Sequence, residues 1–213
     1  MAVIESFKIQ SDLKSDSDIC RIGLSDGSMF SFSSCYLPQE YRDPAFWSLG
    51  RDLGPNEEDC CRFAASCFRA ERLALRLVSR AEQTTRGIFH KLLKRGFKEA
   101  CAWAVISHLS GLDIVNDQRY AELWLRSRLS RGGSSPRRLL ASLHSRGIDR
   151  DSIQAACKLV FTLENELALL VSYVKKKHLE PEDDLHSFKF TLKCEGFSSM
   201  VLEDYLENLE SGQ

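Results

Sequence analysis

A helix-ending sequence pattern occurs three times in this chain at nearly equal spacing. Residues 92–97 read L-L-K-R-G-F, residues 143–148 read L-H-S-R-G-I and residues 192–197 read L-K-C-E-G-F. The three glycines are 51 and 49 residues apart, a period that is typical of stacked supersecondary units. Each glycine follows a helical apolar pattern and precedes an apolar residue, as expected where a helix ends on a glycine in the left-handed conformation. The predicted helix ends are Gly96, Gly147 and Gly196.

The residue twelve positions before each glycine is of a type that commonly begins a helix. Thr84, Ser135 and Asp184 each carry a side-chain oxygen that can accept a hydrogen bond from a first-turn amide. Each middle helix should have one helix before it and one after it. The leading helices are predicted over roughly 70–80, 117–130 and 164–177, and the trailing helices over 98–110, 150–161 and 198–209. Each unit is then a three-helix repeat of about fifty residues.

The first seventy residues follow a different pattern. Residues 19–24 and 28–33 alternate on either side of a Ser-Asp-Gly turn, which predicts two strands and a hairpin. Residues 3–9 predict a third strand. A sheet of this size is marginal alone, so we expect it to pack against residues 36–47 or against the first repeat.

The predicted fold is mainly α, with three tandem three-helix repeats in an elongated, curved array after a small β region. Residues 57–69 supply a lead-in helix to the first repeat. The predicted boundaries are 1–56 for the β-containing region, 57–115 for the first repeat with its lead-in helix, 116–162 for the second repeat and 163–213 for the third.

Composition disfavours several classes of protein. No stretch approaches the roughly 18 apolar residues of a membrane span, and the first ten residues lack the basic start and apolar run of a signal peptide. We therefore expect a cytoplasmic protein with no membrane association. The eight cysteines show no C-x-x-C pair, so we expect most of them to be reduced and buried rather than metal ligands.

Catalytic and cofactor-binding patterns do not support an enzyme. The five histidines show no H-E-x-x-H spacing, and neither the phosphate-binding G-x-x-x-x-G-K-[ST] nor the dinucleotide-binding G-x-G-x-x-G pattern occurs. The sequence therefore predicts a protein that is not an enzyme, with no catalytic residue, cofactor or metal.

The formal net charge of -1 hides a strong segregation of charge. Residues 1–70 contain 7 Lys and Arg against 11 Asp and Glu, residues 71–160 contain 17 against 8, and residues 161–213 contain 5 against 11. A basic, arginine-rich block thus lies between two acidic ones. Guanidinium groups bind phosphates and carboxylates in a bidentate manner and stay charged, so this block is a candidate anion-binding surface.

Two arginines occupy positions that the electrostatics of a helix do not favour. Arg137 and Arg138 fall at the second and third positions of a predicted helix, where the macrodipole favours acidic side chains. Arg86 has the same place in the first repeat. Cations beside free backbone amides at a helix N-terminus make an anion site, which we expect in the first two repeats and not in the third.

Other basic residues have an equally plausible structural role. Glu122 lies three residues after Arg119 and four before Arg126, so both arginines fit ordinary pairing on a solvated helix face as well as ligand binding. Tyr120 lies next to these arginines in the sequence and is a candidate for an aromatic contact with a ligand.

A family resemblance rests mainly on the middle repeat. Residues 114–136 contain N-D-Q-R-Y-A-E followed by R-S-R and then R-G-G-S-S-P, and the helix after them ends in S-R-G-I. This block resembles the RecX family of RecA regulators. The L-x-L-x-x-R pattern at residues 75–80 and K-L-L-K-R-G-F at 91–97 resemble the opening repeat of the family, and the Asp-Gly hairpin is similar to a small β region in some members. The loop at residues 132–135 departs from the family, which usually has an aromatic residue between glycines there.

The resemblance implies a non-catalytic, monomeric protein that binds in the groove of a RecA filament on DNA. Such a protein limits filament growth, ATP hydrolysis and strand exchange in recombination, DNA repair and the SOS response, and contacts DNA weakly or within the filament. The alternative is a nucleic-acid-binding helical repeat module that acts without RecA. The candidate residues for filament or DNA binding are Arg86, Lys91, Lys94, Arg95, Arg119, Tyr120, Arg126, Arg128, Arg131, Arg137, Arg138 and Arg146.

Overall fold

The computed structural model describes residues 2–11, 18–179 and 184–210. The chain divides into two compact units, one of residues 1–82 and 88–115 and the other of residues 83–87 and 116–213. Each unit has its own hydrophobic core.

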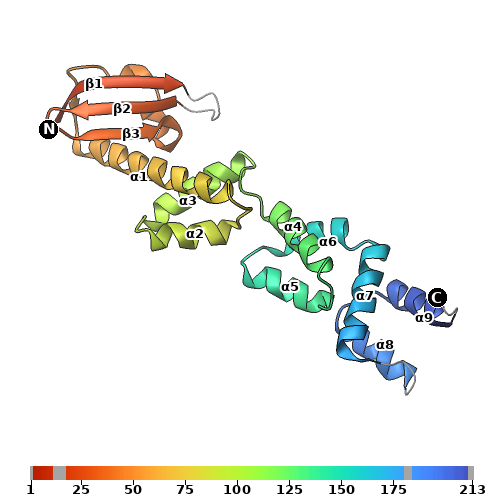
Figure 1. Cartoon of the computed structure of the whole chain (residues 1–213). Helices are drawn as coiled ribbons and strands as arrows, with labels where there is room; N and C mark the ends of the chain where they lie inside the picture. The colour runs from red at the N-terminus through yellow and green to blue at the C-terminus, as the bar shows by residue number, and fades with distance from the viewer. Residues whose placement is uncertain (1, 12–17, 180–183, 211–213) are drawn as a thin grey trace. The chain divides into compact units, whose positions relative to one another are not determined.

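A small antiparallel sheet begins the first unit (Figure 1). Its strands are β1 (Ala2–Ser11), β2 (Asp18–Leu24), β3 (Met29–Ser33) and β4 (Asp52–Leu53), in the order β3-β2-β1-β4. The predicted hairpin is confirmed: Asp26 accepts a hydrogen bond of 2.8 Å from the Ser28 amide, and Gly27 has a φ of 82°. The predicted third strand is confirmed as β1. The sequence did not predict β4, because two residues are too few to show an alternating pattern.

The segment after β3 packs against the sheet and is one of the two alternative partners that the sequence predicted. It forms three short 3-10 helices, η1 (Ser34–Tyr36), η2 (Gln39–Tyr41) and η3 (Pro44–Phe46). Trp47 is 1% exposed, lies 6.0 Å from the ring of Phe32 and donates its indole N–H to the Tyr41 carbonyl. The sheet and the first helices share one core, so the sheet is not left to fold alone.

Three helices follow the sheet: α1 (Pro55–Val78), α2 (Thr85–Lys94) and α3 (Glu99–Gly111). They belong to the first unit except for the first turn of α2, residues 85–87, which belongs to the second. Helix α1 starts with proline at its first position, and Glu57 accepts a 2.7 Å hydrogen bond from the Gly54 amide. The sequence reading separated a lead-in helix at 57–69 from a leading helix at 70–80. That separation is wrong, because no glycine or proline interrupts residues 56–78 and the two segments form one helix.

Six helices form the described part of the second unit: α4 (Asp117–Leu129), α5 (Pro136–Ser145), α6 (Arg150–Val160), α7 (Leu163–Lys177), α8 (Leu185–Cys194) and α9 (Ser199–Glu210). Their core includes Leu125, Leu143, Leu170 and Leu192, all fully or almost fully buried. The described elements therefore run as a small sheet followed by three successive helix triplets, which confirms the predicted fold class.

All three predicted helix ends are confirmed. Gly96, Gly147 and Gly196 have φ values of 83°, 81° and 90°. In each case the amide of the residue after the glycine donates a hydrogen bond to the carbonyl of the buried leucine four residues before the glycine. The distances are 3.3 Å for α2, 3.5 Å for α5 and 3.2 Å for α8. This is the glycine helix stop with its apolar contact, repeated three times.

The predicted helix starts are confirmed as well. Side-chain oxygens of Thr84, Ser135 and Asp184 accept first-turn amides of α2, α5 and α8 at 2.9, 3.4 and 2.9 Å. All eight cysteines are thiols, and Cys20, Cys61, Cys67 and Cys101 are buried. Within the described residues, no helix has the length and apolar character needed to cross a membrane.

Candidate functional site

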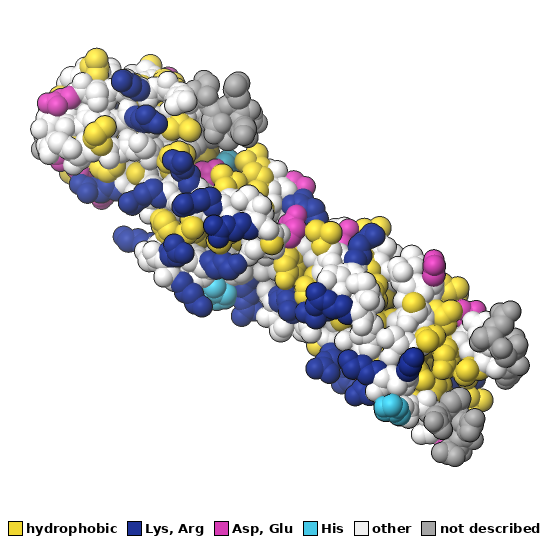
Figure 2. All heavy atoms as spheres, viewed as in Figure 1, with side chains coloured by type: hydrophobic (Ala, Val, Ile, Leu, Met, Phe, Trp, Pro, Cys, Tyr) yellow, Lys and Arg dark blue, Asp and Glu magenta, His cyan; other side chains and the backbone are white. Residues whose placement is uncertain are grey.

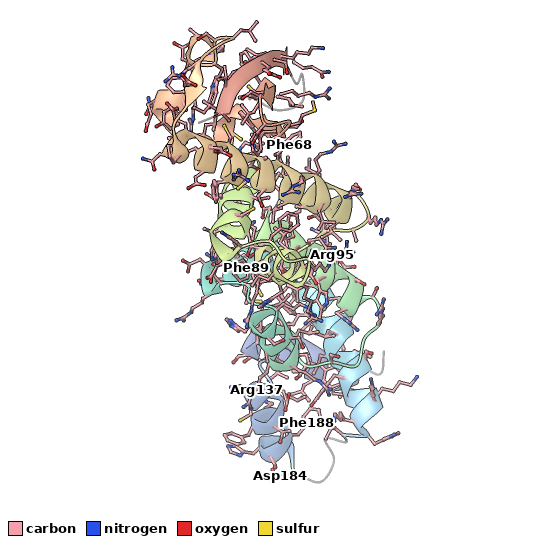
Figure 3. The ribbon with its side chains drawn as sticks, turned by 90° about the vertical axis from the view of Figure 1, so that its left-hand side faces the viewer. Phe68, Phe89, Arg95, Arg137, Asp184 and Phe188 are labelled. Carbon is pink, nitrogen blue, oxygen red and sulfur yellow. The ribbon has the colours of Figure 1, made fainter. Side chains whose placement is uncertain are left out.

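A basic hollow lies at the start of α5 in the second unit. It has a volume of about 310 Å³ and is bordered by the loop after α4, the first turns of α5, the C-terminal half of α7 and the end of α8. Arg137 and Arg138 are exposed at its rim, and Lys177 faces it from α7. The lining residues are Gly133, Ser134, Ser135, Arg137, Arg138, Ala141, Tyr173, Lys177 and Glu195. Figure 2 shows Lys and Arg side chains gathered in this part of the molecule, and Figure 3 labels Arg137.

The loop at residues 132–135 shapes this hollow. Gly132 and Gly133 have φ values of 64° and 70°, and both lie close to α7. A Cβ atom on Gly132 would lie 2.1 Å from Ser172 Oγ, and one on Gly133 would lie 2.4 Å from Lys176 Cδ. The two glycines therefore let the loop approach α7 without a side chain between them.

One part of the sequence prediction for this helix start is wrong. The Arg137 amide donates to the Glu195 carbonyl at 3.0 Å, the Arg138 amide donates to Ser135 Oγ at 3.4 Å, and Pro136 has no N–H. These backbone amides are therefore already bonded within the protein and do not form the predicted anion site. Attraction for an anion rests on the side chains alone.

The start of α2 shows the same use of its amides. Thr85 donates its amide to Asp117 Oδ1 at 2.8 Å and its hydroxyl to Asp117 Oδ2 at 2.7 Å, while the Gly87 amide donates to Thr84. The anion at this helix start is thus the carboxylate of Asp117. The predicted anion site beside Arg86 is occupied by the protein itself, so this part of the prediction is also wrong.

Within the second unit, the C-terminal end of one middle helix lies against the N-terminal end of the middle helix of the preceding repeat. A Cβ atom added to Gly147, at the end of α5, would lie 2.1 Å from Cδ of Arg86. A Cβ atom added to Gly196, at the end of α8, would lie 3.2 Å from the backbone nitrogen of Arg137. Arg86 and Arg137 hold the same position in their helices, so each covers the glycine stop of the following repeat.

Two of the predicted binding residues lie beside the ring of Trp124. The guanidinium groups of Arg128 and Arg146 lie 5.1 and 4.7 Å from the centre of its ring, distances at which a cation is attracted to the aromatic face. Arg146 also donates to the Ser142 carbonyl at 2.6 Å. Trp124 itself is half-buried and packs against the core of the second unit.

The remaining predicted residues of the second unit are more dispersed. Arg126 and Arg131 are exposed, Arg119 is half-buried, and Tyr120 packs against the core of this unit. Glu122, the expected partner of Arg119 and Arg126, accepts a hydrogen bond of 2.9 Å from Gln118.

Burial raises the pKa of Tyr173 at the floor of the hollow, and the nearby charge of Glu195 raises it further, while Arg138 lowers it. The phenol therefore stays neutral and supplies a hydroxyl rather than a charge. Sequence reasoning missed Tyr173 and Lys177, although the run Lys175–Lys177 at the end of α7 was a visible sign of a basic helix end.

The first unit carries its own group of cations. Lys91 and Lys94 lie in the last turn of α2, and Arg95 follows it; all three are exposed. Arg95 borders a hollow of about 720 Å³ with Arg69, Arg72, Leu73, Leu75, Arg76 and Phe97. The three α1 arginines were missed, because their spacing of three and four residues was divided between two predicted helices.

Two other chemistries receive no support from the described residues. Among them, no group of three or more His, Cys, Asp or Glu side chains is placed to hold a metal ion. Residues 23–27 read G-L-S-D-G, a match to the G-x-S-x-G pattern of hydrolase nucleophiles. That pattern requires a strand-to-helix turn, whereas Ser25 lies in the β-hairpin and accepts a hydrogen bond from the Val3 amide.

Comparison with known proteins identifies the family. The family model "RecX, second three-helix domain" matches residues 116–156, which include α4, α5 and most of α6. Regulatory protein RecX of Treponema pallidum (strain Nichols) is 33% identical over 114 residues, which cover 54% of this chain and 70% of that protein. This chain belongs to the RecX family. Regulatory protein RecX of Mycobacterium avium (strain 104) is 34% identical over 85 residues, which cover 40% of this chain and 49% of that protein.

Two solved RecX structures share the fold. A crystal structure of regulatory protein RecX covers 97% of this chain and 100% of its own, with a TM-score of 0.66 and 21% identity. The crystal structure of RecX from Lactobacillus salivarius covers 69% of this chain and 98% of its own, with a TM-score of 0.55 and 23% identity.

Proposed function

We propose that this RecX-family protein is a regulator that binds the RecA filament on DNA and restrains its growth, ATP hydrolysis and strand exchange. It acts without catalysis of its own, as a monomer in the cytoplasm. The observation that carries the proposal is the hollow at the start of α5, where Arg137, Arg138 and Lys177 present positive charge.

The position of two of these arginines supports a role in binding. Arg137 and Arg138 lie in the first turn of α5, where a cation costs about 0.3 to 1 kcal/mol against the helix dipole. Their side chains are exposed and add nothing to the core. A phosphate or carboxylate of a partner would offset that cost, because guanidinium groups bind both in a bidentate manner.

The experiment that tests the proposal is DNA-dependent ATP hydrolysis by RecA with increasing amounts of this protein. A filament regulator should inhibit at amounts well below one molecule per RecA subunit, because blocking the growth of a polymer affects many subunits. Inhibition that needs enough protein to coat the DNA would contradict filament regulation.

The alternative is a RecA-independent nucleic-acid-binding module, favoured by the arginine-rich composition of residues 71–160. Pull-down on RecA filaments, on RecA alone and on bare DNA separates the two. Preferential retention on filaments supports the regulator, and equal retention on bare DNA supports the module.

A further inference from the structure

The exposed face of α1 is positively charged along most of its length. Arg62, Arg69, Arg72 and Arg76 follow the spacing that brings side chains to one side of a helix, and all four are exposed. From residue 60 to the end of α1 the single acidic residue is Glu71, which is 7% exposed and lines a further hollow of about 370 Å³ with Phe68 and Arg72. Figure 2 shows Lys and Arg side chains gathered over α1 and α2.

Two hollows adjoin this arginine face. One, of about 540 Å³, lies between α1 and β3, and its apolar lining includes Met29, Phe30 and Phe68. The other, of about 720 Å³, lies between α1 and the end of α2 and contains Phe97. Arg69 and Arg72 line both, so the hollows adjoin along the helix. Figure 3 labels Phe68 and Arg95, which belong one to each hollow.

Aromatic rings lie directly beside the cations. The guanidinium of Arg62 lies 5.7 Å from the ring centre of Phe30, and that of Arg72 lies 6.0 Å from the ring centre of Phe68. Both rings are only half-buried, and neighbouring Met29 is 77% exposed. The surface thus offers apolar, partly aromatic floors with arginines at their rims.

Helix electrostatics explain only part of this pattern. A cation in the last turn is favoured by the macrodipole, which accounts for Arg76. Arg69 lies more than two turns before the end of α1, beyond the reach of that effect, and Arg62 forms an ion pair with Glu58. Arg69, Arg72 and Arg76 form no ion pair with the described acidic residues, so their charge is available to a partner.

We propose that this face of α1, with β3 and the end of α2, binds single-stranded nucleic acid. The arginines would contact successive phosphates, and unstacked bases would occupy the apolar hollows beside Phe30, Phe68 and Phe97. Arg62 and Arg76 are fourteen residues apart, which is about 21 Å along a helix and enough for a few nucleotides. A duplex offers the same phosphates but keeps its bases stacked inside, and an acidic protein offers no base.

The inference goes beyond the proposed function, since it involves the first unit alone and does not require RecA. Of the residues that the sequence singled out for binding, only Arg95 belongs to this face. If this single-strand site is absent, the proposed regulation of RecA still stands. If RecA is not regulated, the single-strand site still stands.

Fluorescence anisotropy with the full chain and labelled oligo(dT) of about 15 nucleotides tests the proposal. Arg72→Glu with Arg76→Glu should weaken binding at least about tenfold and reduce the slope of log affinity against log salt by about 1.4, from two lost contacts on a single strand. The matched control is Arg150→Glu with Lys158→Glu, two exposed cations on α6, which should change affinity less than about twofold. Equal losses in both variants, or none in the first, would overturn the site.

Two further probes test the choice of ligand. An abasic oligonucleotide of equal length should bind several-fold weaker than oligo(dT), because it lacks the bases that fill the hollows. Equal affinity for the abasic strand, tighter binding to a duplex, or capture of an acidic protein in preference to oligo(dT) would each contradict the proposal.

Folding of the variants is checked by circular dichroism. Arg72→Gln with Arg76→Gln removes the charges without reversing them and should give a loss intermediate between wild type and the double glutamate variant. A folded glutamine variant with wild-type affinity would count against the proposal.

Discussion

The carboxylate of Asp117 accepts both the amide and the hydroxyl of Thr85, at 2.8 and 2.7 Å. The first turn of α4 is thereby bonded to the first turn of α2. A second pair repeats this arrangement with the same separation of 32 residues: Glu166 of α7 accepts the amide of Ser198 at 2.7 Å and its hydroxyl at 3.1 Å, just before α9. In both pairs, a carboxylate on the leading helix of a repeat accepts hydrogen bonds from the amide and hydroxyl of a residue at the start of another helix.

Replacing Asp117 by alanine should destabilise the second unit. The change removes two hydrogen bonds to a charged acceptor and should lower the free energy of unfolding by about 1 to 3 kcal/mol. Urea denaturation followed by circular dichroism measures the loss. Asp151→Ala is the control, since Asp151 is an exposed acid in the first turn of α6; a similar loss in both variants would refute the special role of Asp117.

Two glycine stops should differ in their tolerance of a side chain. Gly96 and Gly147 share a positive φ, but a Cβ atom meets nothing within 4 Å at Gly96 and overlaps Arg86 at Gly147. Gly96→Ala should cost about 1 kcal/mol from the left-handed conformation, whereas Gly147→Ala should cost about 1 to 3 kcal/mol more from overpacking.

Thermal denaturation of the two alanine variants checks the difference. Adding Arg86→Ala to Gly147→Ala should restore part of the stability, because it removes the Cδ and Cγ atoms that the new methyl group meets. Equal melting temperatures for the two single glycine variants would show that the contact with Arg86 has no energetic weight.

Reversing the charges of Arg137 and Arg138 should separate function from stability. The double glutamate variant should be as stable as wild type or slightly more stable, because acidic side chains are favoured at the start of a helix. Its affinity for RecA filaments should fall. If the lost contacts are to duplex phosphates, the slope of log affinity against log salt should decrease by about 1.8.

Filament binding by the charge-reversed protein is compared with that of Arg150→Glu with Lys158→Glu, which changes the charge equally on α6. Wild-type filament affinity in the folded Arg137 and Arg138 variant would show that these arginines are only surface charge.

The cap of α6 should make a pH-dependent contribution to stability. The Ser152 amide, together with its hydroxyl, lowers the pKa of Asp149 by hydrogen bonds of 2.8 and 2.7 Å. A carboxyl group with a lowered folded-state pKa stabilises the fold above its unfolded pKa, and the contribution is lost as the pH falls through the folded value.

Asp149→Asn should therefore cost about 1 kcal/mol or less at pH 7, and the difference from wild type should shrink below about pH 4. Urea denaturation at both pH values measures it. A difference that stays constant down to about pH 2 would show that the charge of Asp149 does not contribute.

The sequence by itself determined the helical framework. The glycine stops at 96, 147 and 196 and the capping residues Thr84, Ser135 and Asp184 all act within one helical turn. Such signals are local, so they can be read without knowing how the helices pack. The same holds for the Asp-Gly hairpin, which lies between two alternating segments.

Tertiary structure alone decided how the basic residues are used. The Arg137 amide donates to the Glu195 carbonyl, 58 residues away, and the Thr85 amide donates to Asp117, so these backbone amides are already bonded within the protein. Packing also placed Arg95, which follows α2, in the lining of the same hollow as Arg72 of α1. No local pattern encodes these partners, because they depend on which helix faces meet and on the small glycines that allow the close approach.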